Sequence, residues 1–140
     1  MKKNLFNLFL SITIFTSLIC SCKNADVSPE YSIEGAFKDI YNPVLCSRPT
    51  MSDVVIKAKG TDYSISFVNL NTAANETLSG FKVEKADSTS KVFYKGAEVG
   101  TFGFMQYTEF SGSNFETKKG MVLMLRFETD NKHLEFMGRK

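Results

Sequence analysis

Apolar and polar residues alternate along most of the chain beyond residue 30. In the segment TDYSISFVN, for example, Tyr63, Ile65 and Phe67 are separated by serines. Because successive side chains of a β-strand point to opposite faces of its sheet, this period of two predicts strands with one buried and one wet face. No sustained apolar stripe at helical spacing occurs there. Eight segments carry the pattern: 31–38, 53–59, 61–69, 80–86, 90–95, 99–107, 121–128 and 133–139.

Three of the connections between these segments are short and contain residues that form tight turns. They hold Gly60, Gly96 and the pair Asp130 and Asn131. Gly, Asn and Asp tolerate the positive φ of hairpin turns, so sequence neighbours are expected to pair. Since closing a sheet removes its exposed edges, we expect an all-β fold in which a single antiparallel eight-stranded meander closes into a small barrel. A two-sheet β-sandwich is the alternative.

The remaining connections are longer, at 40–52, 70–78 and 108–119, and are expected to be loops. Within the last of them, SGSNFETKKG is typical of a flexible polar loop, and it carries Phe115. Gly100 and Gly103 lie inside a predicted strand, where they indicate a bulge or the close approach of a neighbouring chain. Long loops often carry binding residues.

Residues 1–21 have the layout of a secretory signal peptide. Lys2 and Lys3 form a positive start, and residues 5–19 form an apolar run. This run is too short and too polar for a comfortable membrane-spanning helix, which needs about 20 apolar residues. We therefore expect residues 1–21 to be removed as a leader.

The leader ends in ICSC, residues 19–22, which resembles a bacterial lipobox. In such signals an aliphatic residue stands three positions before the cysteine and a small residue directly before it, as Ile19 and Ser21 do for Cys22. The resemblance implies cleavage after Ser21, acylation of Cys22 and an anchor in the bacterial cell envelope, with the outer membrane as the expected location. Residues 22–30 would form a lipidated tether and 31–140 the β-barrel domain. An ordinary signal peptide with soluble release is the alternative.

Without the leader, the chain has 119 residues and no excess charge, because the leader holds two of the 17 basic residues and none of the 15 acidic ones. That length fits one domain. A neutral domain lacks the basic surface of a nucleic-acid binder, so we expect no nucleic-acid partner. Cys46 is then the one cysteine left unacylated, which predicts a domain without an internal disulfide. We interpret Cys46 as a small buried apolar residue, with a reactive thiol as the alternative.

Sequence motifs of catalysis and metal binding are missing from the chain. The single histidine, His133, stands beside a turn and next to Lys132, where we expect it to be solvent-exposed. Carboxylates such as Glu84, Glu128 and Glu135 fall on predicted outer faces near lysines. They are expected to form a solvated, cross-strand-paired exterior rather than a buried acid–base pair. We therefore expect a protein that is not an enzyme and that holds no metal or cofactor.

Gly35-Ala36-Phe37 resembles the Gly-x-Trp signature of lipocalins, with Phe in place of Trp. Lipocalins also pack a late arginine across that aromatic ring, and Arg139 is the candidate match, with Arg126 as the second choice. The resemblance implies a small apolar or amphiphilic ligand in the barrel mouth. The alternative is that Phe37 is a core residue and Arg139 a solvated end charge. The candidate ligand-binding residues are Phe37, Phe67, Phe102, Phe104 and Arg139.

Two functions are compatible with these features. The first is a lipid-anchored, non-catalytic, lipocalin-like binding protein of the cell envelope, whose partner is a small apolar ligand or an envelope protein. The alternative is a structural, assembly or inhibitor lipoprotein that acts through its outer surface. The first predicts a hollow interior, and the second an exposed aromatic patch near Phe93, Phe110 and Phe115 together with a filled core. A filled core would consist of Phe37, Phe67, Phe102, Phe104, Leu123, Leu125 and Phe136.

Overall fold

The computed structural model describes residues 31–40, 49–86, 88–111, 114–130 and 132–140. The expected leader and tether, the acylation site Cys22, and Cys46 lie outside the described residues. Within the described part, no helix is both long and apolar enough to cross a membrane.

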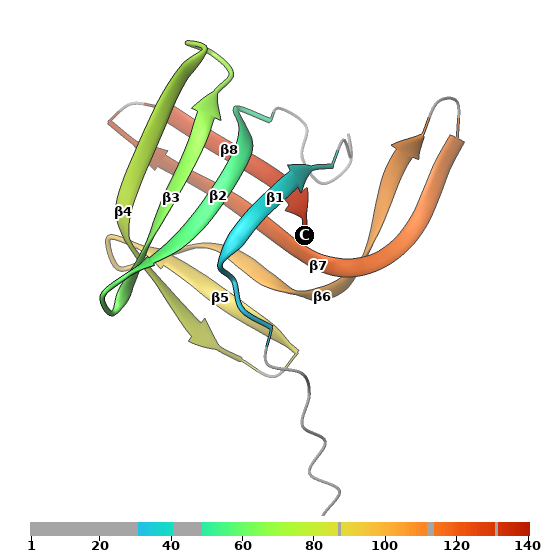
Figure 1. Cartoon of the computed structure of the whole chain (residues 1–140), viewed down its shortest axis with the longest axis horizontal. Coiled ribbons are helices and arrows are strands. Elements are labelled where there is room, and N and C mark those ends of the chain that lie inside the picture. Colours follow the sequence, from blue (N-terminus) through green and yellow to red (C-terminus); the bar gives the residue numbers. More distant parts are fainter. Residues whose placement is uncertain (1–30, 41–48, 87, 112–113, 131) are drawn as a thin grey trace, which may run out of the picture. The chain divides into compact units, whose positions relative to one another are not determined.

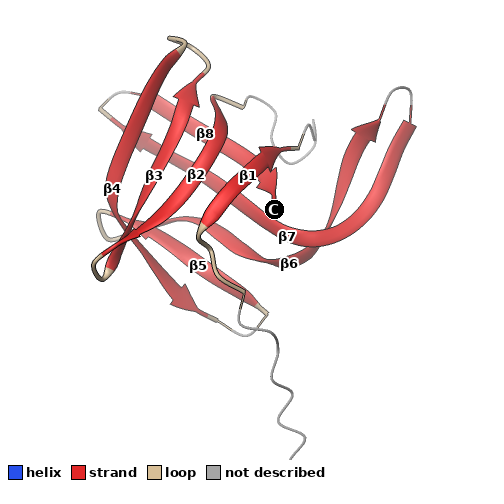
Figure 2. Ribbon diagram, in the orientation of Figure 1, coloured by secondary structure: helices blue, strands red, loops and turns tan. Residues whose placement is uncertain are grey.

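The described residues form strands and turns (Figures 1 and 2). Each strand pairs antiparallel with its sequence neighbours, and β1 also pairs with β8, which closes the barrel. The expected all-β, eight-stranded meander barrel is confirmed, and the sandwich alternative is not formed. The strands are β1 (Gly35–Asp39), β2 (Met51–Lys59), β3 (Asp62–Asn69), β4 (Ala74–Lys85), β5 (Thr89–Tyr94), β6 (Ala97–Ser111), β7 (Asn114–Thr129) and β8 (Lys132–Arg139).

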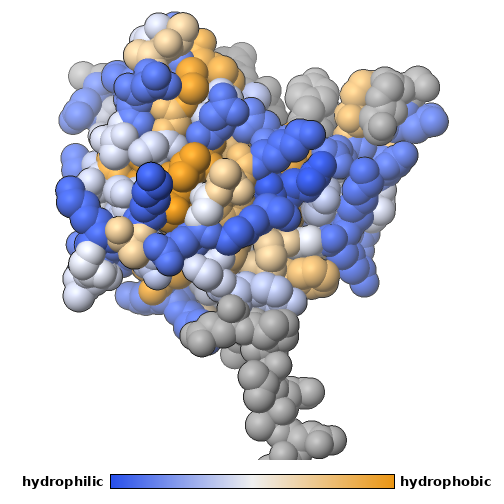
Figure 3. Space-filling model, in the orientation of Figure 1, coloured by the Kyte–Doolittle hydropathy of each residue, from blue (hydrophilic) through white to orange (hydrophobic). Residues whose placement is uncertain are grey.

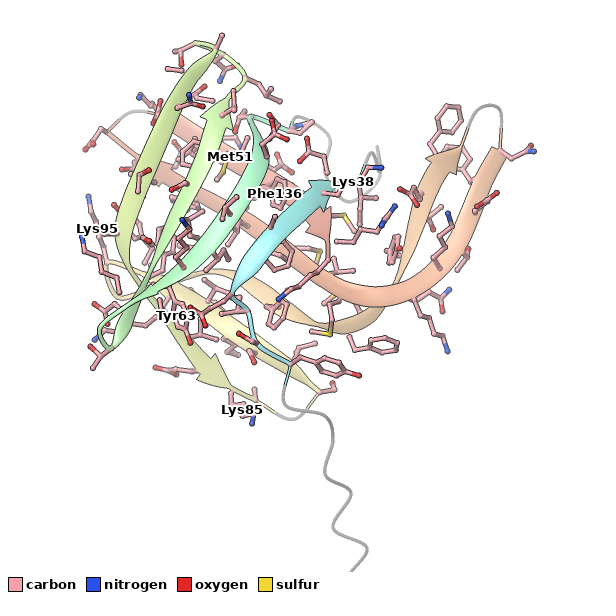
Figure 4. The ribbon with its side chains drawn as sticks, viewed as in Figure 1. Lys38, Met51, Tyr63, Lys85, Lys95 and Phe136 are labelled. Carbon is pink, nitrogen blue, oxygen red and sulfur yellow. The ribbon has the colours of Figure 1, made fainter. Side chains whose placement is uncertain are left out.

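β1 is short, and its first residues pair with β2 whereas its last residues pair with β8. Phe37 faces Val54 of β2, whereas Lys38 faces Arg139 of β8. Met51 of β2 and Phe136 of β8 lie within the barrel, while Lys85 and Lys95 lie at its periphery (Figure 4).

The inward side chains form one apolar cluster, and none of its buried members is more than 7% exposed. The rings of Phe37 and Phe102 meet edge-on at 5.9 Å, and those of Phe81 and Tyr94 stack at 4.5 Å. A hollow wide enough for a ligand would leave such side chains uncovered, so the described side chains fill the barrel. The buried members are Ile33, Phe37, Met51, Val54, Ile56, Ile65, Phe67, Phe81, Val92, Val99, Phe102, Leu123, Leu125, Phe127, Leu134 and Phe136.

Two glycines of β6 allow close contacts within the barrel wall, as the sequence predicts. A Cβ atom on Gly100 would collide with the backbone carbonyl oxygen of Met124. A Cβ atom on Gly103 would lie 2.8 Å from the side chain of Thr89. The β5–β6 register also shifts beside Val92, so the expected bulge is present.

β6 and β7 continue together beyond the barrel. β5 pairs with β6 as far as Gly103, and β8 pairs with β7 only from Val122 onward. The β6–β7 pairing, however, runs on to Ser111 and Asn114. We call residues 104–111 together with 114–121 the arm; Figure 1 shows it curving away from the other strands.

The prediction of a loop at 108–119, with a flexible stretch after residue 110, is wrong, because these residues belong to the two strands of the arm. Alternation of apolar and polar residues marks a strand that rests on a core. The outer half of the arm buries little, so its sequence does not alternate clearly.

The loop expected at 70–78 is also shorter than predicted. β4 begins at Ala74, and Leu78 already faces Ile65 of β3. The turn ends at Ala73, which has a φ of 55°. Residues 74, 75 and 77 are exposed, which explains their polar, loop-like composition. In the connection expected at 40–52, Met51 and Ser52 belong to β2, and residues 41–48 lie outside the described residues.

Candidate functional site

The structure separates the aromatic residues that the sequence suggests for ligand binding. Phe37, Phe67 and Phe102 are 2–3% exposed and belong to the barrel core, as the alternative interpretation of Phe37 proposes. Phe104 follows the last β6 residue that pairs with β5, and it is 50% exposed. A ligand could reach the three core residues only if the core opened.

Arg139 binds a carboxylate of the arm. Its Nε and Nη2 atoms donate to Oε1 of Glu109 at 3.3 and 3.1 Å, and its side chain is 29% exposed. The other arginine considered, Arg126, donates to Oε1 of Glu135 at 2.6 Å. Arg139 is thus a partly buried ion-pair partner rather than a solvated end charge.

One face of the arm, here called the inner face, packs on the outside of the barrel wall. Tyr107 of β6 lies in a second apolar cluster with Val122, Met137 and Ile40, all at most 6% exposed. Met105 and Met124 pack against the same cluster. These contacts join the arm to β7, to β8 and to the residue that follows β1.

Charged groups extend the attachment of the inner face. Lys118 donates to Oε2 of Glu109 at 3.1 Å, on the oxygen that Arg139 does not use. The hydrogen bond from Lys118 lowers the pKa of Glu109, and Arg139 lowers it further, although burial acts in the opposite direction. A carboxylate that stays ionised between two cations holds the arm on the end of β8 over a wide pH range.

The opposite face of the arm, the outer face, exposes aromatic side chains. Phe110 and Phe115 face one another across the two strands, with ring centroids 5.2 Å apart, and are 43% and 61% exposed. Phe104 lies on the same face by strand alternation, and its ring stacks on Tyr31 at 6.1 Å. In the view of Figure 3 the arm is largely hydrophilic, with apolar colour near its tip.

A second group of polar side chains lies on the outer wall of the barrel. Glu135 is 4% exposed, so the prediction of a solvated carboxylate there is wrong. Besides Arg126, it contacts Nε2 of His133 at 3.4 Å, while Nδ1 of His133 lies 2.9 Å from Oε1 of Glu128. Its own N–H donates to the hydroxyl of Thr50.

The charges of this group stabilise one another. The hydrogen bond to Glu128, followed by that to Glu135, raises the pKa of His133. Burial raises the pKa of Glu135, but Arg126 and His133 together outweigh it, so the pKa of Glu135 is lowered. A carboxylate with a lowered pKa is a weak base, because it takes up a proton less readily than an ordinary glutamate. No group of three or more His, Cys, Asp or Glu that could hold a metal occurs among the described residues.

Sequence reasoning could not find this group, because its ion pairs depend on strand register. Arg126 faces Glu135 and Glu128 faces His133 across the β7–β8 ladder. These pairs are recognisable in the sequence only when the turn that joins the two strands has been placed correctly.

Surface hollows lie outside the filled core. One, of about 360 Å³, lies over β6, β7 and β8 and includes Thr101 and Arg126. A second, of about 450 Å³, is lined by residues of β1, β2 and the end of the chain, and it brings Phe37 and Arg139 to one place: Ala36, Phe37, Lys38, Asp53, Val55, Arg139 and Lys140.

A third hollow, of about 730 Å³, lies at one end of the barrel. The residues that line it are mostly of polar type: Pro49, Thr50, Asn69, Asn71, Thr72, Lys132 and His133.

Comparisons of the chain with protein-family models, with curated proteins and with solved structures give no match. The assignment of a function therefore depends on the geometry of the arm and the barrel.

Proposed function

We propose that this chain is a lipid-anchored, non-catalytic binding protein of the bacterial cell envelope, and that it binds its partner on the outer face of the arm. The observation that carries the proposal is the exposed pair Phe110 and Phe115 on a projecting arm. The filled barrel supports an outer-surface function over an interior ligand.

Exposed aromatic side chains that gather on one surface are typical of interaction sites. Aromatic residues are enriched among the side chains that carry most of the binding energy of protein interfaces. The outer face groups Phe110 and Phe115, and Phe104 stacks on Tyr31 farther along the same strand. Grouped aromatic rings of this kind mark a binding surface more strongly than scattered ones do.

The inner face gives these aromatics a rigid support. Tyr107 is buried against the barrel wall, and Glu109 is held by Arg139 and Lys118. A surface that is already ordered before binding loses less conformational entropy when a partner arrives. The arm therefore combines an exposed contact face with a fixed position on the barrel.

The lipid anchor is part of the same proposal, and its support is the signal layout of residues 1–21 with the lipobox resemblance at 19–22. Each buried CH₂ group contributes about 0.8 kcal/mol, so several acyl chains on Cys22 would anchor the domain without a membrane-binding surface of its own. Cys22→Ala should abolish the incorporation of labelled fatty acid. Cys20→Ala and Cys46→Ala should leave it unchanged, and labelling that survives Cys22→Ala would refute the anchor.

Photo-cross-linking in cells tests the binding surface. A photoreactive amino acid at position 115 should give discrete cross-linked products. The same amino acid at position 70 should not, although Leu70 is also an exposed apolar residue, at 50%. Equal cross-linking at both positions would mean that the arm has no special affinity for a partner.

A further inference from the structure

Over most of the arm, each strand has a neighbour on one side only among the described strands. Beyond Gly103, no strand of the described part pairs with residues 104–109 on the side that β5 occupies within the barrel. On the other side of the arm, residues 114–120 of β7 likewise have no described strand neighbour. Such an edge presents one N–H and one C=O group at every second residue, and it can accept a further strand.

The two edges of the arm differ in their charge. The β7 edge carries Glu116, Lys118 and Lys119, all exposed. Charged side chains, and lysines above all, are the usual protection of an edge against strand addition. The β6 edge carries a single charge over residues 104–109, that of Glu109, which already binds Arg139 and Lys118. The β6 edge is therefore the less protected one.

The β6 edge carries a phenylalanine at each end of a seven-residue stretch. In FMQYTEF, residues 104–110, the two phenylalanines stand at equal distances from Tyr107. If a second copy were paired antiparallel about Tyr107, Phe104 would face Phe110 of the second copy on the outer face, and aromatic cross-strand pairs of this kind are favourable. Both phenylalanines are well exposed, at 50% and 43%.

The same register avoids electrostatic repulsion. Glu109 would face Met105 of the second copy, so the two glutamates lie on opposite sides of the two-fold axis. Gln106 would face Thr108, and both of these side chains are polar. A pairing that is isologous requires this self-complementarity, because every contact occurs twice.

We propose that the arm binds a second copy of this chain, edge to edge, through β6 residues 105–109 about a two-fold axis at Tyr107. The two arms then form one continuous four-stranded sheet. This inference rests on the proposed function, since it names the partner of the arm. The pairing is short, so membrane anchoring of both copies, which raises their effective concentration, promotes it.

Disulfide formation between two copies tests the register. Opposed residues of antiparallel strands have Cα atoms about 4.5–5.5 Å apart, within the range that a disulfide bridges. Full-length Gln106→Cys and Thr108→Cys proteins, both carrying Cys46→Ser and different tags, are produced together and oxidised mildly in the membrane. We expect several-fold more mixed dimer than either variant forms with itself.

The β7 edge supplies the control for this measurement. A mixture of Thr117→Cys and Lys119→Cys proteins should give no mixed dimer above the level of each variant alone. Equal cross-linking through the two edges, or self-linked Gln106→Cys at the level of the mixture, would overturn the proposed pairing.

Proline substitutions test the edge without a new thiol. Thr108 and Thr117 face one another across the arm. A proline at either position therefore has the same effect on the pairing of β6 with β7. The two variants differ in which outer edge loses an N–H group: the β6 edge in Thr108→Pro and the β7 edge in Thr117→Pro. In light-scattering measurements on the detergent-solubilised, lipidated protein, Thr108→Pro should be monomeric and Thr117→Pro should dimerise like the unsubstituted chain. Equal masses for the two variants, or an unsubstituted chain that is monomeric at every concentration, would refute the inference.

The proposed function and this inference fail in different ways. If position 115 still cross-links to other envelope proteins in Thr108→Pro, while no dimer forms in the unsubstituted chain, the arm is a binding surface for a different partner. If position 115 cross-links to nothing in any variant, the proposed function itself is wrong.

Discussion

Residues 97–103 and 104–111 belong to one continuous strand, β6, but they have different neighbours. The first part pairs with β5 and β7 and sends Val99 and Phe102 into the barrel core. The second part pairs with β7 alone among the described strands and exposes Phe104 and Phe110. The comparison shows how one strand can contribute to a closed, filled barrel and then continue beyond it with exposed aromatic side chains.

The division of β6 between the barrel and the arm follows from the number of strands in the barrel. An eight-stranded barrel is just wide enough for side chains to fill its interior, so its stability and its closure depend on the same inward residues. Among the described residues of the arm, Met121 packs against that core, whereas residues 104–111 contribute no member to it. The arm can therefore carry exposed aromatics and an edge with few charges at little cost to the free energy of folding.

The largest difference in the free energy of unfolding is expected between two variants, each with one phenylalanine replaced, one in the barrel and one in the arm. Phe136→Ala should lower the free energy of unfolding by about 3–5 kcal/mol, because it leaves a cavity in a packed core. Phe115→Ala should change it by no more than about 0.5 kcal/mol, because that ring is 61% exposed. Urea denaturation of both variants measures the difference. Similar losses would mean that the arm is an integral part of the core.

A glycine from each region gives the next largest difference. Gly100→Ala should cost about 1–3 kcal/mol, since the new methyl group meets the carbonyl of Met124 and the strands must move apart. Gly120→Ala in the arm should cost much less, because the nearest atom, on Tyr107, lies 3.4 Å from the new Cβ. A tolerated Gly100→Ala in thermal denaturation would show that β6 and β7 are less closely packed there than the geometry implies.

The barrel follows from the sequence because its strands rest on a core. Ile65 and Phe67 stand two residues apart, as do Leu123 and Leu125, and every strand of the closed meander overlaps a segment that this pattern marks. The role of Gly100 and Gly103 can also be predicted from the sequence, because a glycine inside a strand indicates a bulge or the close approach of a neighbouring strand.

The arm could not be predicted in the same way. Asn114, Phe115 and Thr117 are all exposed, so no alternation marks them as a strand. The sequence suggests an aromatic ring as the partner of Arg139, whereas Glu109 becomes its neighbour only through the curvature of β6 and β7 beside the end of β8. Such contacts depend on curvature and register, which a single sequence does not display.

The stability of the barrel should depend on pH through the ion pairs of His133 on its outer wall. The pKa of His133 in the folded chain is raised above its ordinary value of 6.5. The ion pairs of His133 therefore contribute fully to stability below pH 6.5, and this contribution is lost as the pH rises through the pKa of the folded state. The pKa of Glu135 in the folded chain is lowered below its ordinary value of 4.5. Its ion pairs therefore contribute fully to stability above pH 4.5, and this contribution is lost as the pH falls through the pKa of the folded state. The stability difference between the unsubstituted chain and His133→Gln should therefore shrink as the pH rises above 6.5. A difference that stays constant on the alkaline side of that value would exclude the ion pairs of His133.

The smallest global effect is expected from the attachment of the arm. Arg139→Gln removes the partner of Glu109 and should cost no more than about 1 kcal/mol overall, since the pair is partly exposed. Hydrogen exchange should nevertheless quicken in residues 104–121 and stay unchanged in β3. Faster exchange throughout the barrel would show that Arg139 supports the closure between β1 and β8 instead.

Hydrogen exchange within β6 tests the central claim most directly. In the isolated unit Tyr31–Lys140 at low protein concentration, we expect the amides of residues 97–103 to exchange only through global unfolding. Those of residues 104–109 should exchange through a local opening of clearly lower free energy. Equal opening free energies on both sides of Gly103 would contradict the division of this strand into scaffold and contact surface.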